Sequence, residues 1–211
     1  MKKSHLIATL GAAALLCSCI PSVNPFYTDK DVVFDARLPG VWRESGGKDQ
    51  SQPEVWKFEK SGDKAYKLVV TDKDGKQGQF DAHLFKLKQE NFLDLIPGDC
   101  DYATNQADLV AFAMFPGHLL VRVPQLGPEL KLAFFNFDWL EKYLKQNPGA
   151  LAHHTEVEPG KDSGRIVLTA GTRDLQRFVL KHLGEGELFD KPGILTRQTN
   201  TVSATAQPVS Q

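Results

Sequence analysis

Histidine and carboxylate side chains are the groups in this chain that could do chemistry, and the first chemistry they suggest is metal binding. The chain has six histidines, and the densest group is His153, His154 and Glu156. In an extended segment His154 and Glu156 would share one face, and imidazole and carboxylate groups bind zinc. A site would need a third ligand, and the sequence has no His-Glu-x-x-His pattern and no paired cysteines. We therefore favour a solvated loop that enters a strand, and predict no metal site.

A second pair, Asp81 and His83, could support acid–base chemistry. The two residues are separated by one position in an alternating run, so both side chains would face the same way on a strand. They could form an acid–base pair or a histidine held by a carboxylate. The alternative, which we prefer, is the polar outer face of a barrel.

The third candidate is Cys100, between Asp99 and Asp101 in the longest irregular segment. Adjacent carboxylates disfavour the thiolate, which is the reactive form, and this argues against a catalytic cysteine. Together with Asn105 and Asp108 the two aspartates could hold calcium, but their spacing fits no EF-hand loop. A solvated loop is the preferred interpretation.

Motifs for other reactions are missing from the sequence. It contains no Gly-x-Ser-x-Gly elbow for nucleophilic hydrolysis and no glycine-rich phosphate loop between a strand and a helix. The formal net charge is −1, which gives no electrostatic reason to expect nucleic acid as a partner. These absences favour binding over catalysis, and we predict no cofactor.

Hydrophobic alternation with period two dominates the segments that would carry these groups. It predicts strands at 40–42, 55–59, 66–70, 79–88, 92–96, 109–115, 119–123 and 129–135, with a further strand at 165–170. Helical spacing follows Asp138 and Thr172, which are expected to cap two short helices ending near Asn147 and Gly184. We predict a mainly β fold, an antiparallel meander closed into a lipocalin-like β-barrel of eight or nine strands with two helices near the C-terminal end, because closure removes exposed edges.

Large apolar residues on these strands form a candidate ligand pocket. An eight-stranded barrel is just wide enough for side chains to fill it or for one small ligand. Dense filling is the alternative that the packing of protein interiors favours. The candidate pocket residues are Trp42, Trp56, Phe58, Tyr66, Phe80, Leu84 and Phe92.

The N-terminal residues resemble a bacterial lipoprotein signal. Lys2 and Lys3 precede an apolar run that is too short to span a bilayer, and Leu16 and Ser18 stand at the large and small positions before Cys19. The resemblance implies that Cys19 becomes lipidated, and with multiple acyl chains the anchor would be effectively permanent. Ile20 and Pro21 follow instead of an aspartate, which implies the outer membrane, facing the periplasm, if the host has two membranes.

These features divide the chain into a signal peptide (1–18), a tether (19–30), one barrel-like domain (31–198) and a disordered tail (199–211). Removal of residues 1–18 would leave 23 basic and 26 acidic residues, a net charge of −3. It would also leave Cys100 as the single free thiol, so no intramolecular disulfide would form. The exported domain would depend on its hydrophobic core.

Two resemblances cover more of the chain. Gly40-Val41-Trp42 resembles the Gly-x-Trp element at the first strand of lipocalins and other calycins, which implies that Trp42 closes the barrel floor. The stretches 24–28, 92–95 and 168–170 are similar to a group of uncharacterised bacterial lipoproteins, and that similarity implies an anchor but no activity.

The sequence thus predicts a non-catalytic binding module, tied to the cell envelope through acylated Cys19, for an apolar small molecule or an envelope protein. A scaffold of the envelope that acts by its outer surface, without a pocket, is the second hypothesis. A hydrolase or metal enzyme that uses His83, His153 or His154 is the third.

Overall fold

The computed structural model describes residues 20–45, 52–98, 117–156 and 164–198. Strands dominate these residues, and two α-helices follow toward the C-terminal end. The strands are β1 (Pro21–Ser22), β2 (Gly40–Glu44), β3 (Val55–Ser61), β4 (Ala65–Thr71), β5 (Gln77–Leu87), β6 (Glu90–Pro97), β7 (His118–Leu126), β8 (Glu129–Phe134), β9 (His153–Glu156), β10 (Arg165–Leu168) and β11 (Gly193–Arg197). The helices are α2 (Phe137–Gln146) and α3 (Thr172–His182), and a 3₁₀ turn covers Leu183–Glu185.

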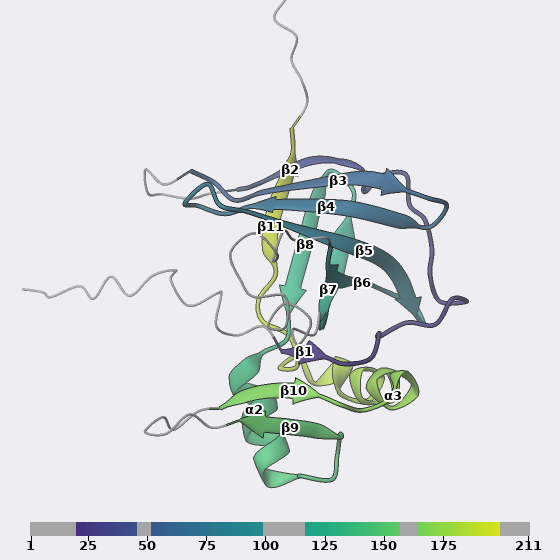
Figure 1. Ribbon diagram of the computed structural model, residues 1–211, viewed down its shortest axis with the longest axis vertical. Coiled ribbons are helices and arrows are strands. Elements are labelled where there is room, and N and C mark those ends of the chain that lie inside the picture. Colours follow the sequence, from purple (N-terminus) through teal and green to yellow (C-terminus); the bar gives the residue numbers. More distant parts are fainter. Residues whose placement is uncertain (1–19, 46–51, 99–116, 157–163, 199–211) are drawn as a thin grey trace, which may run out of the picture.

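Eight of these strands form a closed antiparallel barrel (Figure 1). Their order is β6-β5-β4-β3-β2-β11-β8-β7, and pairing of β7 with β6 closes the ring. Consecutive strands pair from β2 to β8, as a meander requires, and β11 fills the gap between β2 and β8. The predicted β-barrel is confirmed.

The membership of the barrel differs from the sequence prediction in one strand. The predicted strand at 109–115 lies outside the described residues, and the eighth position is taken by β11, which the sequence analysis did not identify. Its only buried side chain is Leu195, so its alternation is weak. Its pairing partners, β2 and β8, are both distant in sequence.

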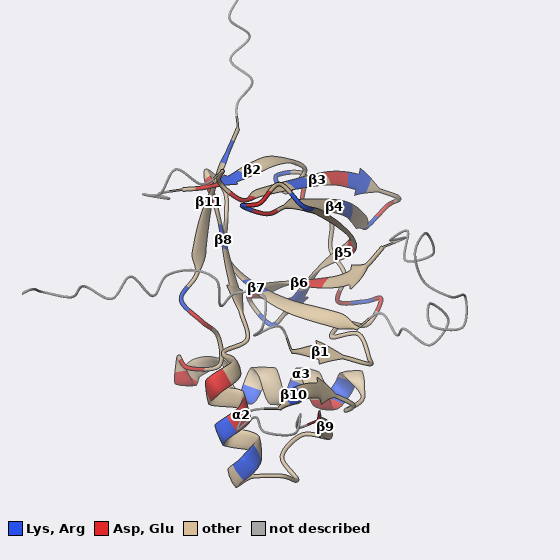
Figure 2. Ribbon diagram, turned by 60° about the vertical axis from the view of Figure 1, so that its left-hand side comes forward, with Lys and Arg blue, Asp and Glu red and all other residues tan. Residues whose placement is uncertain are grey.

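A second layer covers part of the outer wall of the barrel. Strand β1 pairs with β7 in antiparallel fashion and with β10 in parallel, and β9 completes this short extension. Both α2 and α3 lie beside it, below the barrel in Figures 1 and 2. Figure 2 also shows acidic and basic residues interspersed along these helices.

The predicted helices are present, but both begin at different caps. Asn136 caps α2, because its side-chain oxygen accepts the Trp139 N–H at 3.0 Å, and Asp138 lies in the first turn instead. Gly171 precedes α3, and the Thr172 hydroxyl donates to Pro25 O at 2.8 Å. The hydroxyl of Thr172 therefore fastens the helix to the N-terminal segment.

The wall of the barrel separates two hydrophobic cores. The barrel core fills the interior with side chains from all eight strands, including Trp42, Phe58, Leu68, Leu93 and Leu130. The outer core lies between the outer face of the wall and the second layer, and it includes Ile20, Phe85, Phe92, Leu140, Phe178 and Phe189. Strands of the shared wall bury both faces, as β6 shows with four consecutive buried residues.

Candidate functional site

The barrel interior is where the predicted pocket residues were expected to meet. Trp42, Trp56, Phe58, Tyr66 and Leu84 belong to the barrel core, and each is at most 5% exposed. Phe80 packs against the same core while partly exposed. Phe92 points to the opposite side of the wall, where its ring stacks on Phe85 with centroids 5.6 Å apart.

Several side chains of the barrel core pack without internal space around them. A space large enough for water would leave accessible area on the residues around it, yet Trp42, Tyr66, Leu68 and Leu93 have none. Phe58 contacts Tyr66 edge to face, with ring centroids 6.5 Å apart. This packing leaves these side chains no internal surface for a ligand.

The Gly-x-Trp element packs against Arg197 of β11. The Trp42 indole N–H donates to Leu38 O at 2.8 Å, and the Arg197 guanidinium from β11 lies over the indole at 4.4 Å from the ring centroid. Arg197 also donates to Pro39 O at 2.8 Å. Gly40 has a φ of +141°, and a Cβ there would lie 2.3 Å from Arg197 Nη1, so glycine makes room for this stack.

A buried polar cluster occupies the outer face of the wall. Asp94 of β6 is fully buried, and its Oδ2 accepts the Phe26 backbone N–H at 2.8 Å. Its Oδ1 accepts from His118 Nδ1 at 2.7 Å, and the His118 side chain is 13% exposed. A buried carboxylate needs such partners to offset its lost hydration.

His83 lies directly opposite Asp94 on the neighbouring strand β5. The Tyr27 hydroxyl is 3.2 Å from His83 Nδ1, and the two rings lie with centroids 4.8 Å apart at an interplanar angle of 31°. Burial lowers the pKa of His83, and the nearby carboxylates of Asp94 and Asp81 oppose that shift. Burial also raises the pKa of Tyr27, with Asp94 adding to the effect.

This histidine–aspartate cluster has no nucleophile aligned with it in the described residues. Ser22 lies opposite His118 in the β1–β7 register, but its hydroxyl is fully buried and donates to Asn24 O at 2.8 Å. The geometry indicates a structural role, because the hydrogen bond from Phe26 N–H to Asp94 holds the segment around Phe26 against the barrel wall. The sequence analysis selected Asp81 and His83, and the buried aspartate that bonds a histidine is instead Asp94, with His118 as its partner.

Residues 20–33, which we name the strap, are bound to the domain over their length. Ile20 and Phe26 are buried in the outer core, and Val33 N–H donates to Leu84 O at 2.8 Å. From the second layer, Gln176 donates to Phe26 O at 2.9 Å. The tether predicted for residues 19–30 is therefore not a free spacer from Ile20 onward, because its apolar side chains and backbone groups find partners on the domain.

The candidate metal ligands stay apart from any larger cluster. His153, His154 and Glu156 lie on β9, at the edge of the extension, and His154 and Glu156 are exposed. His153 Nδ1 is 2.8 Å from Leu151 O. The part of the chain that the structure describes contains no group of three histidine, cysteine or acidic residues that could hold a metal. Asp99, Cys100, Asp101, Asn105 and Asp108 lie outside the described residues.

A surface depression of about 200 Å³ lies where β7 and β8 meet the segment before β11. Arg122 reaches it from β7 and is paired with Glu90, with Nη2 and Oε2 2.9 Å apart. Burial raises the pKa of Asp190, and Asp138 adds to the effect. The depression is lined by Arg122, Ala133, Leu183, Gly186, Leu188, Phe189, Asp190, Lys191 and Pro192.

Comparisons with known proteins add no relative: no protein-family model, curated protein or solved structure matches the chain. None of the helices in the described ranges is long and apolar enough to cross a membrane.

Proposed function

We propose that this protein is a lipoprotein of the bacterial cell envelope whose barrel is a non-catalytic module that binds an envelope partner through its outer surface. The observation that carries the proposal is the burial of side chains in the barrel core, among which Trp42, Tyr66 and Leu68 have no accessible area. A binding module of this kind uses its exterior.

The membrane attachment in this proposal is the acylated Cys19. Each buried methylene of an acyl chain contributes about 0.8 kcal/mol, so several chains make release negligible. The strap supports this arrangement because it joins the residue after Cys19 directly to the domain, with Ile20 only 3% exposed. A domain held in this way stays at the membrane surface, where partners are concentrated.

Lipid labelling tests the anchor. Cys19→Ala should abolish incorporation of labelled palmitate and move the chain from the membrane fraction to the soluble fraction. Cys17→Ala is the matched control and should change neither, because Leu16 before Cys17 is too bulky for the cleavage position. Membrane retention of Cys19→Ala would refute the lipoprotein assignment.

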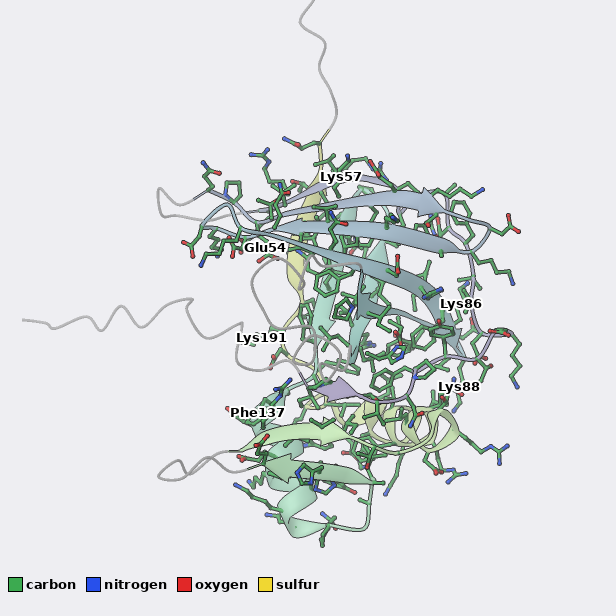
Figure 3. All side chains as sticks on the ribbon, in the orientation of Figure 1. Glu54, Lys57, Lys86, Lys88, Phe137 and Lys191 are labelled. Carbon is green, nitrogen blue, oxygen red and sulfur yellow. The ribbon has the colours of Figure 1, made fainter. Side chains whose placement is uncertain are left out.

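A second experiment separates a partner-binding module from a carrier of an apolar ligand. Native mass spectrometry of the purified Cys19→Ala chain should show the mass of the protein alone, because side chains occupy the interior. A photo-crosslinker in place of Lys57, which is 52% exposed on β3 (Figure 3), should give a discrete adduct with an envelope protein in cells. A co-purified lipid without any adduct would favour the carrier and overturn the proposal.

A further inference from the structure

Strand β9 forms one edge of the sheet. Among the described residues it pairs with β10 alone, and it lies farthest from the barrel in Figure 1. Thr169 N–H donates to Ala152 O at 2.9 Å, and in an antiparallel pair the positions that bond the neighbouring strand alternate with positions that do not. By that alternation the backbone N–H and C=O groups of His153 and Thr155 point away from β10, so this edge can accept a further strand.

The side chains of β9 alternate between two faces. Leu168 of β10 is buried in the outer core, and its partner in the register is His153. His154 and Glu156 therefore lie on the opposite face of the sheet, and both are exposed. An imidazole and a carboxylate are two zinc ligands, but a structural zinc site needs four, and the described part of this chain adds no third.

A second copy of the chain can supply the missing ligands. When two β9 edges pair in antiparallel fashion about a two-fold axis at Thr155, the outward backbone groups of this residue bond those of its copy. His154 of each chain then lies opposite Glu156 of the other, in a pair without backbone bonds whose Cα atoms are about 4.5 Å apart. Two histidines and two glutamates thereby meet on one face.

Parity and charge select this register. A shift by one residue would set the outward backbone groups of one copy against positions that bond β10 in the other, so the two edges could not bond. A shift by two residues would set His154 opposite His154, whereas the two-fold axis at Thr155 sets an acid opposite a base. Cross-strand pairs of opposite charge are favourable and pairs of like charge are not.

The ligand set matches the chemistry of zinc. Imidazole nitrogens and carboxylate oxygens bind zinc at about 2.0–2.2 Å in tetrahedral geometry. Arg165 lies opposite Glu156 in the register and shares its face, so it can bond the carboxylate oxygen that the metal leaves free. Because β9 has four residues, its backbone bonds alone form a short contact, and the metal then controls association.

We propose that two copies of this chain join through their β9 edges and hold a zinc ion between His154 and Glu156 of each copy. The dimer changes the sequence prediction of no metal site, because the second copy provides the ligands that one chain lacks. It is independent of the proposed acylation of Cys19, and it adds a metal site and self-association to the proposed binding module.

Sedimentation of the full Cys19→Ala chain tests the site, with Cys17→Ser and Cys100→Ser included so that no thiol competes for zinc. We expect the mass of a dimer with zinc sulfate, at one zinc ion per two chains, and the mass of a monomer with EDTA. His154→Ala and Glu156→Gln should each remain monomeric with zinc, because a symmetric site loses two of its four ligands. Both side chains are exposed, so the guanidinium midpoint should stay unchanged and separate loss of the site from loss of the fold.

His153→Gln is the matched control, since His153 is the neighbouring histidine on the other face of the strand. It should form the zinc dimer as the parent chain does. A parent chain that stays monomeric with zinc would overturn the proposal, and so would a zinc dimer that survives both His154→Ala and Glu156→Gln. A dimer that persists in EDTA would overturn the role of the metal.

Disulfide formation tests the strand pairing. Thr155→Cys in the same background should link two chains under mild oxidation with zinc, because a hydrogen-bonded pair has Cα atoms about 5.5 Å apart, within the range of about 4.4–6.8 Å that disulfides span. Lys67→Cys, exposed on β4, is the control and should give little linked product. Equal linkage at positions 155 and 67 in a chain that dimerises with zinc would overturn the pairing of the β9 edges.

Discussion

The strongest test of the strap is the substitution Asp94→Ala. Asp94 accepts two hydrogen bonds on the outer wall of the barrel, from Phe26 N–H at 2.8 Å and from His118 Nδ1 at 2.7 Å, and its side chain is fully buried. Alanine would leave the Phe26 N–H and the His118 ring without their acceptor.

The magnitude follows from these two contacts. A hydrogen bond to a charged group contributes about 1.5–3 kcal/mol. Asp94→Ala removes two such bonds. Because the His118 side chain keeps 13% of its surface exposed, water can partly replace its lost partner. We expect Asp94→Ala to lower the free energy of unfolding by about 3 kcal/mol, which is two such hydrogen bonds at the low end of their range.

Guanidinium unfolding of the soluble Cys19→Ala chain measures this loss, and hydrogen exchange at the Phe26 amide locates it. Asp81→Ala is the matched control, since Asp81 is an exposed aspartate on the neighbouring strand β5, and its effect should stay within about 0.5 kcal/mol. A loss for Asp94→Ala no larger than that of Asp81→Ala, with Phe26 exchange unchanged, would refute the role assigned to the cluster.

Two further predictions concern the barrel floor and the second histidine. Gly40→Ala should lower the free energy of unfolding by about 1–3 kcal/mol in guanidinium, because φ of Gly40 is +141° and the new Cβ would displace Arg197 from Trp42. Gly127→Ala is the control, since a Cβ at Gly127 would meet no atom within 4 Å. Equal losses of stability for the two variants would contradict this reasoning. Burial lowers the pKa of His83, so the unfolded chain binds a proton at this histidine more readily than the folded chain does. The contribution of neutral His83 to stability is therefore complete above the pKa of the unfolded chain, about 6.5. It declines as the pH falls below that pKa. His83→Gln should flatten the decline in urea midpoint on acidification, and parallel curves for the two proteins would argue against this origin.

Much of the barrel could be predicted because its strands carry their facing pattern locally. Trp56 and Phe58 alternate with exposed Lys57 and Glu59, and both aromatic side chains point into the barrel core. Strand β11 carried no comparable signal, because only Leu195 is buried among residues 193–197. Its place between β2 and β8 depends on pairing across the whole chain, which local periodicity cannot show.

The same reasoning explains what the sequence could and could not predict about the site. Alternation placed most predicted pocket residues in the interior, but it cannot say whether their volumes fill it. In the run from Phe92 to Ile96 four consecutive positions are buried, so parity does not distinguish the inward Leu93 from the outward Phe92. Asp94 was the available signal there, because a carboxylate within a buried run needs a specific partner.

The two cores also limit where a partner could bind. The outer core and the strap cover the outer face of β5, β6 and β7. The outer faces of β3 and β4 remain, where Lys57, Glu59 and Lys67 are exposed. Phe34, 37% exposed, lies on the ring of Tyr66 with centroids 5.3 Å apart, and Lys60 Nζ lies 5.1 Å from the Phe34 ring centroid. An exposed aromatic ring with a lysine over it is a suitable centre for a protein interface, so the adduct expected at Lys57 should weaken with Phe34→Ala.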